Sequence, residues 1–394
     1  LNITQEGQDS QRIYAANLDI SLRGDLLALK HVQVNAPQGT IVITGQASLR
    51  NQMPLDFLVD WTWNADESAP LSGNFALQGD TDWSDGIGFD LSYKLEANGL
   101  SSLDASLPTR EQISGLFRGA LADEDLQIDQ LTAAFEDSAI KLGIEGKVSA
   151  LNTDTPELDT RLTWEGLHWP LLSPEPDVAS PEGSLSILGP LEGYELLVET
   201  QVVGVDIPAG SWQLQGAGNL EQLQLAELKG QLLGGEINFR GETRWEPLPS
   251  WQLSLEGRTL DIGQLMPELP GQLDLRATTN GQLHPEDCIQ AQVTVENVSG
   301  TLLDYPLALN ADLNVAGETV KLSRLQLDSG QNRVQASGRA SAETLDLDWQ
   351  LRALNPGELY PGAAGTLIGQ GQVSGSPEAP RINGRLRGEQ LGLD

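Results

Sequence analysis

The sequence predicts an all-β, elongated repeat protein in which one continuous curved antiparallel sheet forms a hydrophobic groove, with very little helix. Three observations predict this fold class. Apolar and polar residues alternate along most of the chain, a marker glycine returns about every hundred residues, and turn signals separate the alternating runs. None of the apolar runs approaches the roughly 20 residues that a membrane-spanning helix needs.

The marker glycines are Gly45, Gly146, Gly241 and Gly338, which lie 101, 95 and 97 residues apart. Upstream of each stands a pair of apolar residues three positions apart, in the segments LKHV, IDQL, LAEL and LSRL. The residues two and four positions before each glycine are apolar, and the residue directly before it is polar. This period of two indicates β-strands with one apolar and one wet face. The glycine falls on the apolar face, which predicts a bend in the sheet or the close approach of a ligand.

The repeats follow one another in phase, so we expect a single array without independent domains. Its parts are a partial repeat at 1–72, repeats at 73–182, 183–270 and 271–364, and a partial repeat at 365–394. Each repeat is expected to hold seven or eight strands joined by tight turns, which favours antiparallel neighbours.

Helix is expected in only three places. These are the connectors Asp261–Leu269 and Asn355–Gly362, and a short stretch around Ser106–Ser114. The Pro-rich connector Pro170–Gly183 is expected to be a flap or loop, because the repeat resumes in phase after it.

Composition limits the function. The chain carries 23 Lys and Arg against 56 Asp and Glu, a formal net charge of −33 that repels nucleic acid and anionic membrane surfaces. We therefore expect no nucleic-acid binding. The single cysteine, Cys288, excludes an intrachain disulfide. The sequence begins and ends in mid-pattern, so we expect an internal fragment of a longer protein, and we expect this fragment to be monomeric.

No residue pattern points to catalysis, so we expect no enzymatic activity and no cofactor. His284, Asp287 and Cys288 stand close together, and a cysteine–histidine pair is one form of activated nucleophile. Their spacing is local and the segment sits at an expected hairpin turn, which makes a solvated turn the stronger interpretation.

Metal binding is also weakly supported. The stretch Asp80–Gly86 resembles the start of a calcium loop, but its twelfth position is Leu91, where such a loop carries a bidentate Glu. An acidic turn is the stronger interpretation. His31, His168 and His284 have no metal-ligand spacing with another His or Cys, so a zinc site is not expected.

Two architectures would cover the apolar faces: two sheets over a dry core, or one sheet curled into a trough. Aromatics are few, with 9 Trp, 6 Phe and 5 Tyr, which favours an unfilled hollow. The residues expected to line it are Ile41, Ile43, Leu142, Ile144, Ile237, Phe239, Leu253, Leu255, Val334, Ala336, Leu345 and Leu347. Trp164, Trp251 and Trp349 recur at similar places in the repeats; packing on neighbours is the stronger interpretation, and lining the groove mouth is the alternative.

The tail at Gly365–Asp394, the Leu-Pro-Gly connector at Leu269–Gly271 and the alternating strands around it resemble the repeats of the TamB family, in the wider AsmA-like group. The resemblance covers essentially the whole chain and depends on glycine and aliphatic spacing. It implies a long β-groove in the periplasm of a Gram-negative bacterium, in a protein anchored in the inner membrane by a segment outside this sequence. It also implies transport of phospholipid to the outer membrane, and an outer-membrane β-barrel partner, TamA, contacted by regions outside this fragment.

We therefore expect a periplasmic bridge-like lipid-transfer segment that carries phospholipids along a hydrophobic β-groove between the inner and outer membranes. Acyl chains would lie inside, where each buried methylene gains about 0.8 kcal/mol. One alternative is an adaptor or chaperone for outer-membrane protein assembly with a TamA-like partner, which holds strands by strand addition. Another is an acidic β-repeat stalk or adhesin with a dry core.

Overall fold

The structure is a computed structural model, and it describes residues 2–3, 11–12, 15–36, 38–48, 52–63, 71–84, 86–103, 107–153, 155–173, 175–205, 207–284, 288–358 and 362–393. Helix in this part is limited to three 3-10 turns, η1 (Leu100–Ser102), η2 (Ile262–Gln264) and η3 (Pro356–Glu358). The chain forms two compact units. The first unit is Leu1–Tyr194 with Val198–Ile207, and the second unit is Glu195–Leu197 with Pro208–Asp394.

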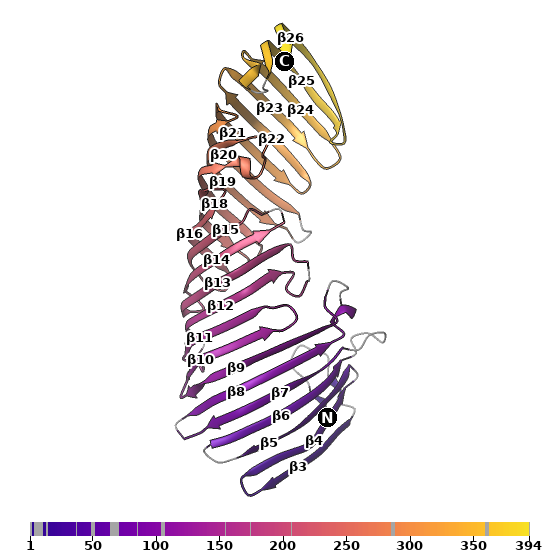
Figure 1. The fold of residues 1–394 in the computed structure, drawn as a ribbon, viewed down its shortest axis with the longest axis vertical. Coiled ribbons are helices and arrows are strands. Elements are labelled where there is room, and N and C mark those ends of the chain that lie inside the picture. The colour runs from indigo at the N-terminus through magenta and orange to yellow at the C-terminus, as the bar shows by residue number, and fades with distance from the viewer. Residues whose placement is uncertain are drawn as a thin grey trace. The chain divides into compact units, whose positions relative to one another are not determined.

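In the first unit, each strand from β3 to β13 pairs antiparallel with the next strand along the chain (Figure 1). The strands are β3 (Ala15–Arg23), β4 (Leu26–Ala36), β5 (Gly39–Ser48), β6 (Gln52–Trp63), β7 (Leu71–Asp82), β8 (Ile87–Asn98), β9 (Arg110–Ala122), β10 (Asp125–Phe135), β11 (Lys141–Ser149), β12 (Glu157–Trp169) and β13 (Val178–Pro190). A separate ladder joins β1 (Asn2–Ile3) to β2 (Gln11–Arg12). Strand β14 (Tyr194–Gly204) has residues in both units.

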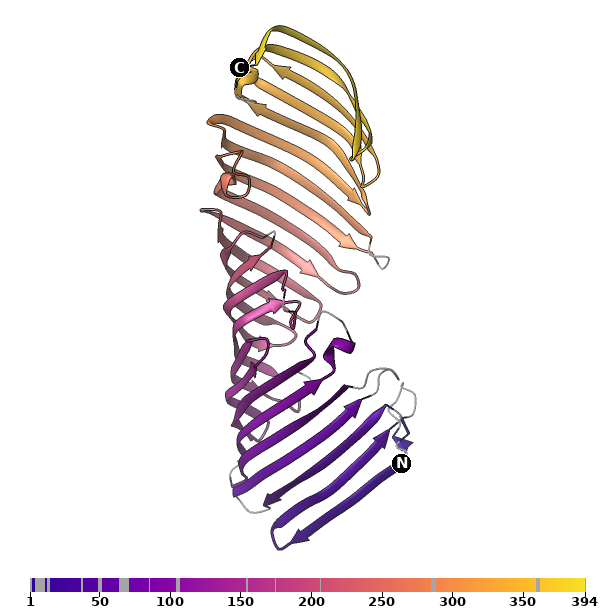
Figure 2. The same ribbon diagram turned by 45° about the vertical axis from the view of Figure 1, so that its right-hand side comes forward.

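The second unit repeats this arrangement from β15 to β26, again with antiparallel pairing of consecutive strands. The strands are β15 (Gly210–Gly218), β16 (Gln222–Leu232), β17 (Gly235–Arg244), β18 (Ser250–Asp261), β19 (Gly271–Leu283), β20 (Ile289–Leu302), β21 (Tyr305–Ala316), β22 (Thr319–Ser329), β23 (Asn332–Ala340), β24 (Leu345–Ala353), β25 (Ala363–Ser376) and β26 (Ala379–Leu393). Each unit's sheet is visibly twisted and curved (Figure 2). The predicted fold class, all-β with a curved antiparallel sheet and very little helix, is confirmed.

The repeat holds six strands rather than the seven or eight expected. The marker glycines fall in β5, β11, β17 and β23, which are six strands apart. The difference comes from strand length. The strand β26 reaches 15 residues, whereas a strand in a globular protein averages about five or six. Because the strands are long, a repeat of the same length forms fewer of them.

Each marker glycine stands opposite a β-bulge. Leu225 of β16 pairs with Gly241 of β17, and the next registered pair is Leu228 with Phe239, so three steps on β16 match two on β17. The same shift occurs opposite the other three glycines, in β4, β10 and β22. One extra residue brings two apolar side chains three positions apart to the same face. This bulge explains why the apolar pairs in LKHV, IDQL, LAEL and LSRL are three positions apart.

The close approach expected at the marker glycines is made by the neighbouring strand. Gly241 has a φ of 141°, and a Cβ at this position would collide with the backbone carbonyl oxygen of Gln252 in β18. Gly146 has a φ of 136° and meets Asp159 of β12 in the same way. Only glycine tolerates both this backbone conformation and this contact, so the glycine is part of the bulge.

Two of the three expected helical connectors are confirmed as single turns, since η2 lies within Asp261–Leu269 and η3 within Asn355–Gly362. The third is wrong: residues 104–106 lie outside the described part, and β9 begins at Arg110. Ile113 and Phe117 of β9 pair with Leu95 and Leu91 of β8, so tertiary pairing prevails over local preference.

The connector expected at Pro170–Gly183 is shorter than predicted. Residues Val178 onward belong to β13, and the backbone N–H of Asp177 donates to the carbonyl oxygen of Trp169, 2.9 Å away. This hydrogen bond closes the connection between β12 and β13.

Candidate functional site

One face of the second unit is lined by apolar residues from strand to strand. Because paired residues in neighbouring strands point to the same side, the registers define rows that run across the sheet. The central row is Leu214, Leu228, Phe239, Leu255, Ala277, Val295, Ala311, Leu325, Ala336, Trp349, Gly371 and Gly384. A flanking row is Trp212, Gly230, Ile237, Gly257, Leu275, Val298, Leu309, Leu327, Val334, Leu351, Gly369 and Leu386. Neither row contains a charged residue.

The first unit has an equivalent apolar face. One of its rows is Gly79, Leu91, Phe117, Leu131, Ile144, Leu162 and Leu185, from β7 to β13. The opposite side of the same strands carries Asp and Glu. In β12, for example, Leu158, Leu162 and Trp164 are half-buried on one side, and the alternate residues Glu157 and Asp159 point to the other.

The twelve residues expected to line the groove lie on these apolar faces. Of them, Ile41, Ile43, Leu142 and Ile144 belong to the first unit and the other eight to the second. Eleven are half-buried and Ile41 is exposed. In each unit the sequence pattern therefore selected residues that share one face.

The apolar faces are incompletely covered. The chain exposes 24223 Å² to solvent, whereas a globular protein of 42.4 kDa exposes about 15,000 Å². Even two separate globular proteins of half that mass would together expose only about 18,000 Å². In the described part of each unit, substantial contacts join only adjacent strands, or a strand and a 3-10 turn. Half-buried apolar rows are the result of a single sheet layer.

Side chains are sealed along one edge of the second unit, which we call the closed edge. The row there contains Leu260, Leu307, Ser329, Asn332 and Ala353, all buried. Here the connectors that contain η2 and η3 pack against the strand ends. Ala353 is 1% exposed and Asn332 is 2% exposed.

Asn332 organises the closed edge through its amide. Its Nδ2 donates to the carbonyl oxygen of Asn355 (2.8 Å) and to Oε2 of Glu358 (3.0 Å), and its Oδ1 accepts from the backbone N–H of Asn355 (3.0 Å). Glu358 Oε2 also accepts from the backbone N–H of Gln331 at 2.8 Å. These bonds tie η3 to the turn between β22 and β23.

The first unit has a comparable closed point around Ile140, which is 0% exposed. Glu111, itself buried, accepts hydrogen bonds there from the backbone N–H of Asp137 (3.1 Å) and the hydroxyl of Ser138 (2.6 Å). The backbone N–H of Gln112 donates to the same carboxylate at 3.1 Å. The carboxylate therefore holds the β10–β11 turn, at the end of which Ile140 lies.

The recurring tryptophans lie over glycines of neighbouring strands. A Cβ on Gly183 or Gly281 would collide with the indole ring of Trp164 or Trp251, respectively. Two of the indole N–H groups are hydrogen-bonded, with Trp164 Nε1 donating to Ser180 Oγ (2.6 Å) and Trp251 Nε1 to Thr279 Oγ1 (3.1 Å). Packing of this kind compensates for a missing side chain. The rings pack on the sheet and also form part of its apolar face.

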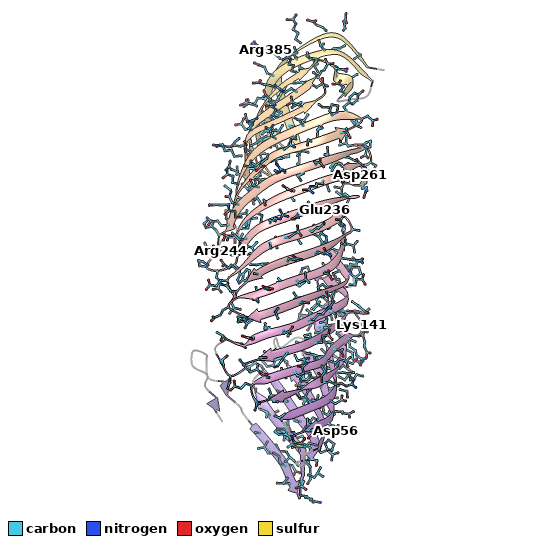
Figure 3. All side chains as sticks on the ribbon, turned by 90° about the vertical axis from the view of Figure 1, so that its left-hand side faces the viewer. Asp56, Lys141, Glu236, Arg244, Asp261 and Arg385 are labelled. Atoms are coloured by element: carbon cyan, nitrogen blue, oxygen red, sulfur yellow. The ribbon has the colours of Figure 1, made fainter. Side chains whose placement is uncertain are left out.

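The opposite face of each sheet is polar and acidic, and Figure 3 shows its side chains projecting outward, Lys141 and Glu236 among them. Lys141 Nζ lies 2.7 Å from Glu165 Oε2, and Lys229 Nζ lies 2.9 Å from Glu236 Oε2. The hydrogen bond from Lys229 holds the pKa of the Glu236 carboxyl below its ordinary value. The first pair is exposed and the second is half-exposed, so both add little to stability.

The two segments considered as reactive and metal sites, His284–Cys288 and Asp80–Gly86, lie at the ends of strands. The backbone N–H of His284 donates to the carbonyl oxygen of Cys288 (3.1 Å), and His284 Nε2 lies 3.0 Å from the amide nitrogen of Gln282; Asp287 lies outside the described residues. In Asp80–Gly86, β7 continues through Asp82, whose Oδ1 accepts from the backbone N–H of Ser84 at 2.9 Å.

The histidines lie apart from potential co-ligands. His31 Nε2 lies 3.3 Å from Gln33 Oε1, and His168 Nδ1 lies 2.9 Å from the carbonyl oxygen of Gly166. Over the ranges that the structure describes, His, Cys, Asp and Glu side chains form no group of three suited to a metal ion.

Comparison with known proteins agrees with these features. A family model described as "TamB, N-terminal domain" matches residues 73–394. The chain belongs to the TamB family. One relative within this family is the translocation and assembly module subunit TamB of Haemophilus influenzae, 26% identical over 218 residues. The match spans 53% of this chain and 16% of that TamB protein.

The resemblance to TamB predicted from glycine and aliphatic spacing is thus confirmed. No solved structure matches the chain. Within the described ranges, none of the helices has the length and apolar character required to cross a membrane.

Proposed function

We propose that this chain is a lipid-transfer segment of a TamB-type protein, in which the apolar faces carry the hydrocarbon chains of phospholipids. The observation that supports it is the combination of two properties in the same residues. The apolar rows are unbroken by charge within each unit, and most of their members are half-buried rather than sealed. A dry sandwich core would bury them fully.

Physical chemistry favours a mobile occupant on such a face. Transfer of a hydrocarbon chain from water gains about 0.8 kcal/mol for each buried methylene. Contacts with aliphatic side chains are non-directional, so successive positions along a row bind with similar free energy. The charged phospholipid headgroup would stay in water at the open side, because burial of an unpaired charge is costly.

The setting of this function follows from the family. We propose that the full protein is anchored in the inner membrane of a Gram-negative bacterium by a segment outside this chain. We propose that the present chain lies in the periplasm. We further propose that phospholipid moves between the inner and outer membranes, and that an outer-membrane β-barrel of the TamA type is contacted by regions beyond this chain.

Native mass spectrometry of the chain purified from bacterial membranes tests the proposal. We expect co-purified phospholipid on the wild-type chain. The variant Leu255→Asp places a carboxylate in the central row and is expected to lose that lipid. The matched control Ser254→Asp places the same charge one residue away on the polar face, beside Arg240, and is expected to keep it.

Circular dichroism of both variants separates loss of lipid from loss of fold. In an open trough, the carboxylate introduced by Leu255→Asp stays hydrated and the chain stays folded. Unfolding of Leu255→Asp alone indicates a dry core, because a buried carboxylate without a partner is strongly destabilising. If a folded Leu255→Asp variant keeps its lipid, the central row is not part of the lipid-binding surface.

A second candidate is an adaptor that holds extended strands of outer-membrane proteins. The observation that favours it is the name of the relative, which describes a subunit of a translocation and assembly module. Strand addition uses backbone hydrogen bonds rather than an apolar face. Bound peptide without phospholipid in the same mass spectra supports the adaptor over the lipid-transfer segment.

A further inference from the structure

Aromatic residues are concentrated in the first unit. Five of the six phenylalanines of the chain, Phe57, Phe75, Phe89, Phe117 and Phe135, lie in β6 to β10, and only Phe239 lies in the second unit. Besides Trp63 and Phe135 at strand ends, the registers place six aromatic residues of β6 to β9 on the same apolar face. These residues, which we call the aromatic section, are Phe57, Trp61, Phe75, Phe89, Tyr93 and Phe117.

Four rings of the aromatic section, those of Phe57, Trp61, Phe89 and Tyr93, lie over glycines of neighbouring strands. A Cβ on Gly73 would come within 2.6 Å of the Trp61 ring, and a Cβ on Gly115 within 2.7 Å of the Tyr93 ring. The Phe57 ring covers Gly45 of β5 in the same way. A ring that lies over a glycine takes the place of the missing side chain without projecting far from the sheet. All six side chains of the aromatic section are half-buried, so part of each ring stays exposed.

Tyr93 is fixed in this position by its hydroxyl. Its Oη donates to the carbonyl oxygen of Thr132, 2.6 Å away in β10, so the side chain spans β9. The rings also contact one another, with centroids 4.4 Å apart for Phe89 and Phe117 and 6.4 Å apart for Phe75 and Tyr93. Rings held this way lose little conformational freedom when a ligand binds.

From β19 to β23, between Leu255 and Trp349, the central row of the second unit offers mostly smaller side chains. It includes Ala277, Ala311 and Ala336, and it ends with Gly371 and Gly384. A flat aromatic ring makes many more van der Waals contacts with a hydrocarbon chain than a methyl group does. The two units therefore present unequal surfaces to the same ligand.

The scarcity of charged side chains around the aromatic section limits which ligands it can bind. Among the described residues of β6 to β9, Glu111 at the start of β9 is the one carboxylate on this face. It is 3% exposed and accepts hydrogen bonds from Gln112, Asp137 and Ser138. Because the exposed part of the face is uncharged, its occupant is an uncharged hydrocarbon chain and not a headgroup or a charged peptide.

We propose that the aromatic section is a holding station, which binds the hydrocarbon tail of a phospholipid more tightly than the apolar face of the second unit does. The inference is based on the proposed lipid transfer and adds a preferred position to it. Lipid occupancy is then uneven along the chain, with the greatest residence time at β6 to β9.

Photo-cross-linking of the full chain tests the station. The probe is phosphatidylethanolamine vesicles that contain a phosphatidylcholine with a diazirine on one acyl chain. After irradiation and proteolysis, mass spectrometry locates the cross-linked residues. We expect the density of cross-links on β6 to β9 to exceed that on β19 to β24 by about threefold or more, because of the larger contact area of the rings.

A variant pair refines the test without removing the apolar face. The double variant Phe75→Leu with Phe117→Leu keeps the strands apolar and is expected to lower the cross-link density on β6 to β9 to that of the second unit. The control Leu58→Ala removes an exposed apolar side chain from the polar face of β6 and is expected to leave the ratio unchanged.

The outcomes separate the station from the transfer function. Equal cross-link density in both units of the wild-type chain, or a ratio that the double variant does not change, overturns the station while the lipid-transfer proposal stands. Cross-links to a second copy of the chain in place of lipid also overturn it. Cross-links in neither unit overturn both proposals.

Discussion

Two isoleucines four residues apart illustrate the two environments of this fold. Ile140 precedes β11 and is 0% exposed, whereas Ile144 lies within β11 and is half-buried on the apolar face. The two side chains are identical. The difference is that Ile140 lies in the turn that Glu111 holds by hydrogen bonds, while Ile144 has only neighbouring strands beside it.

The second unit repeats this contrast. Asn332 and Ala353 at the closed edge are sealed by the η3 connector, whereas Phe239 and Leu255 in the central row are half-buried. A single-layer sheet thus concentrates its tight packing where connectors fold back, and leaves its broad apolar face half-buried. The following substitutions test this division, from the largest expected effect to the smallest.

The largest expected effect is at Ile140. We expect Ile140→Ala to lower the free energy of unfolding by about 3 kcal/mol, because it leaves a cavity in a sealed site. The matched variant Ile144→Ala removes the same atoms from a half-exposed site and is expected to cost about 1 kcal/mol. Urea denaturation followed by circular dichroism measures both. Equal losses would contradict the distinction between closed and open sites.

The marker glycines come next. We expect Gly241→Ala to lower the free energy of unfolding by about 2 kcal/mol, because alanine is strained at a φ of 141° and its Cβ strikes the carbonyl oxygen of Gln252. Gly193, in the turn after β13, has open space where a Cβ would stand, with no other atom within 4 Å. Gly193→Ala is therefore the control, and no loss is expected. A harmless Gly241→Ala would show that the bulge does not need glycine.

Asn332 tests the hydrogen bonds of the closed edge. We expect Asn332→Ala to cost about 1.5 kcal/mol, because it leaves the backbone groups of Asn355 and the carboxylate of Glu358 without their partner. Amide hydrogen exchange at η3 should accelerate at the same time. The exposed Asn314 provides the control Asn314→Ala, for which we expect a change below about 0.5 kcal/mol. An unchanged exchange rate at η3 would show that Asn332 does not hold the η3 connector in place.

Tyr93 gives the smallest effect, which depends on pH. Burial disfavours the phenolate and raises the pKa of Tyr93 above its ordinary value of 10.0. The folded chain thus binds the phenolic proton more tightly than the unfolded chain does, so this contribution to stability is complete below pH 10 and is lost as the pH rises through the raised pKa. We expect stability to fall less steeply above pH 10 in Tyr93→Phe than in the wild-type chain. Identical slopes would show that Tyr93 is not buried.

Much of this arrangement was predictable from the sequence, because it depends on local periodicity. The alternation before Gly146 or Gly241 predicted which residues share a face. The spacing of three between Leu225 and Leu228 is the sequence signal of the bulge. The predicted number of strands per repeat and the predicted helix around Ser106–Ser114 were wrong, since strand formation and strand length depend on pairing with neighbours.

The closed edge and the aromatic section were not predictable in this way. Asn332 and Asn355 are 23 residues apart, and their hydrogen bonds depend on how the η3 connector folds back. The cover of Tyr93 over Gly115 depends on the register between β8 and β9. No short sequence pattern encodes such a register, because it is set by the lengths of the intervening turns.

Thiol labelling in the central row tests the central claim most directly. In a Cys288→Ser background, Leu255→Cys places a single thiol in the central row, with Ser254→Cys on the polar face and Ala353→Cys at the closed edge as references. If the apolar face is open, the thiol at 255 reacts with a small maleimide in the folded chain nearly as fast as the thiol at 254, and phospholipid vesicles slow it. A thiol at 255 that stays as protected as the one at 353 until the chain is unfolded would contradict the account.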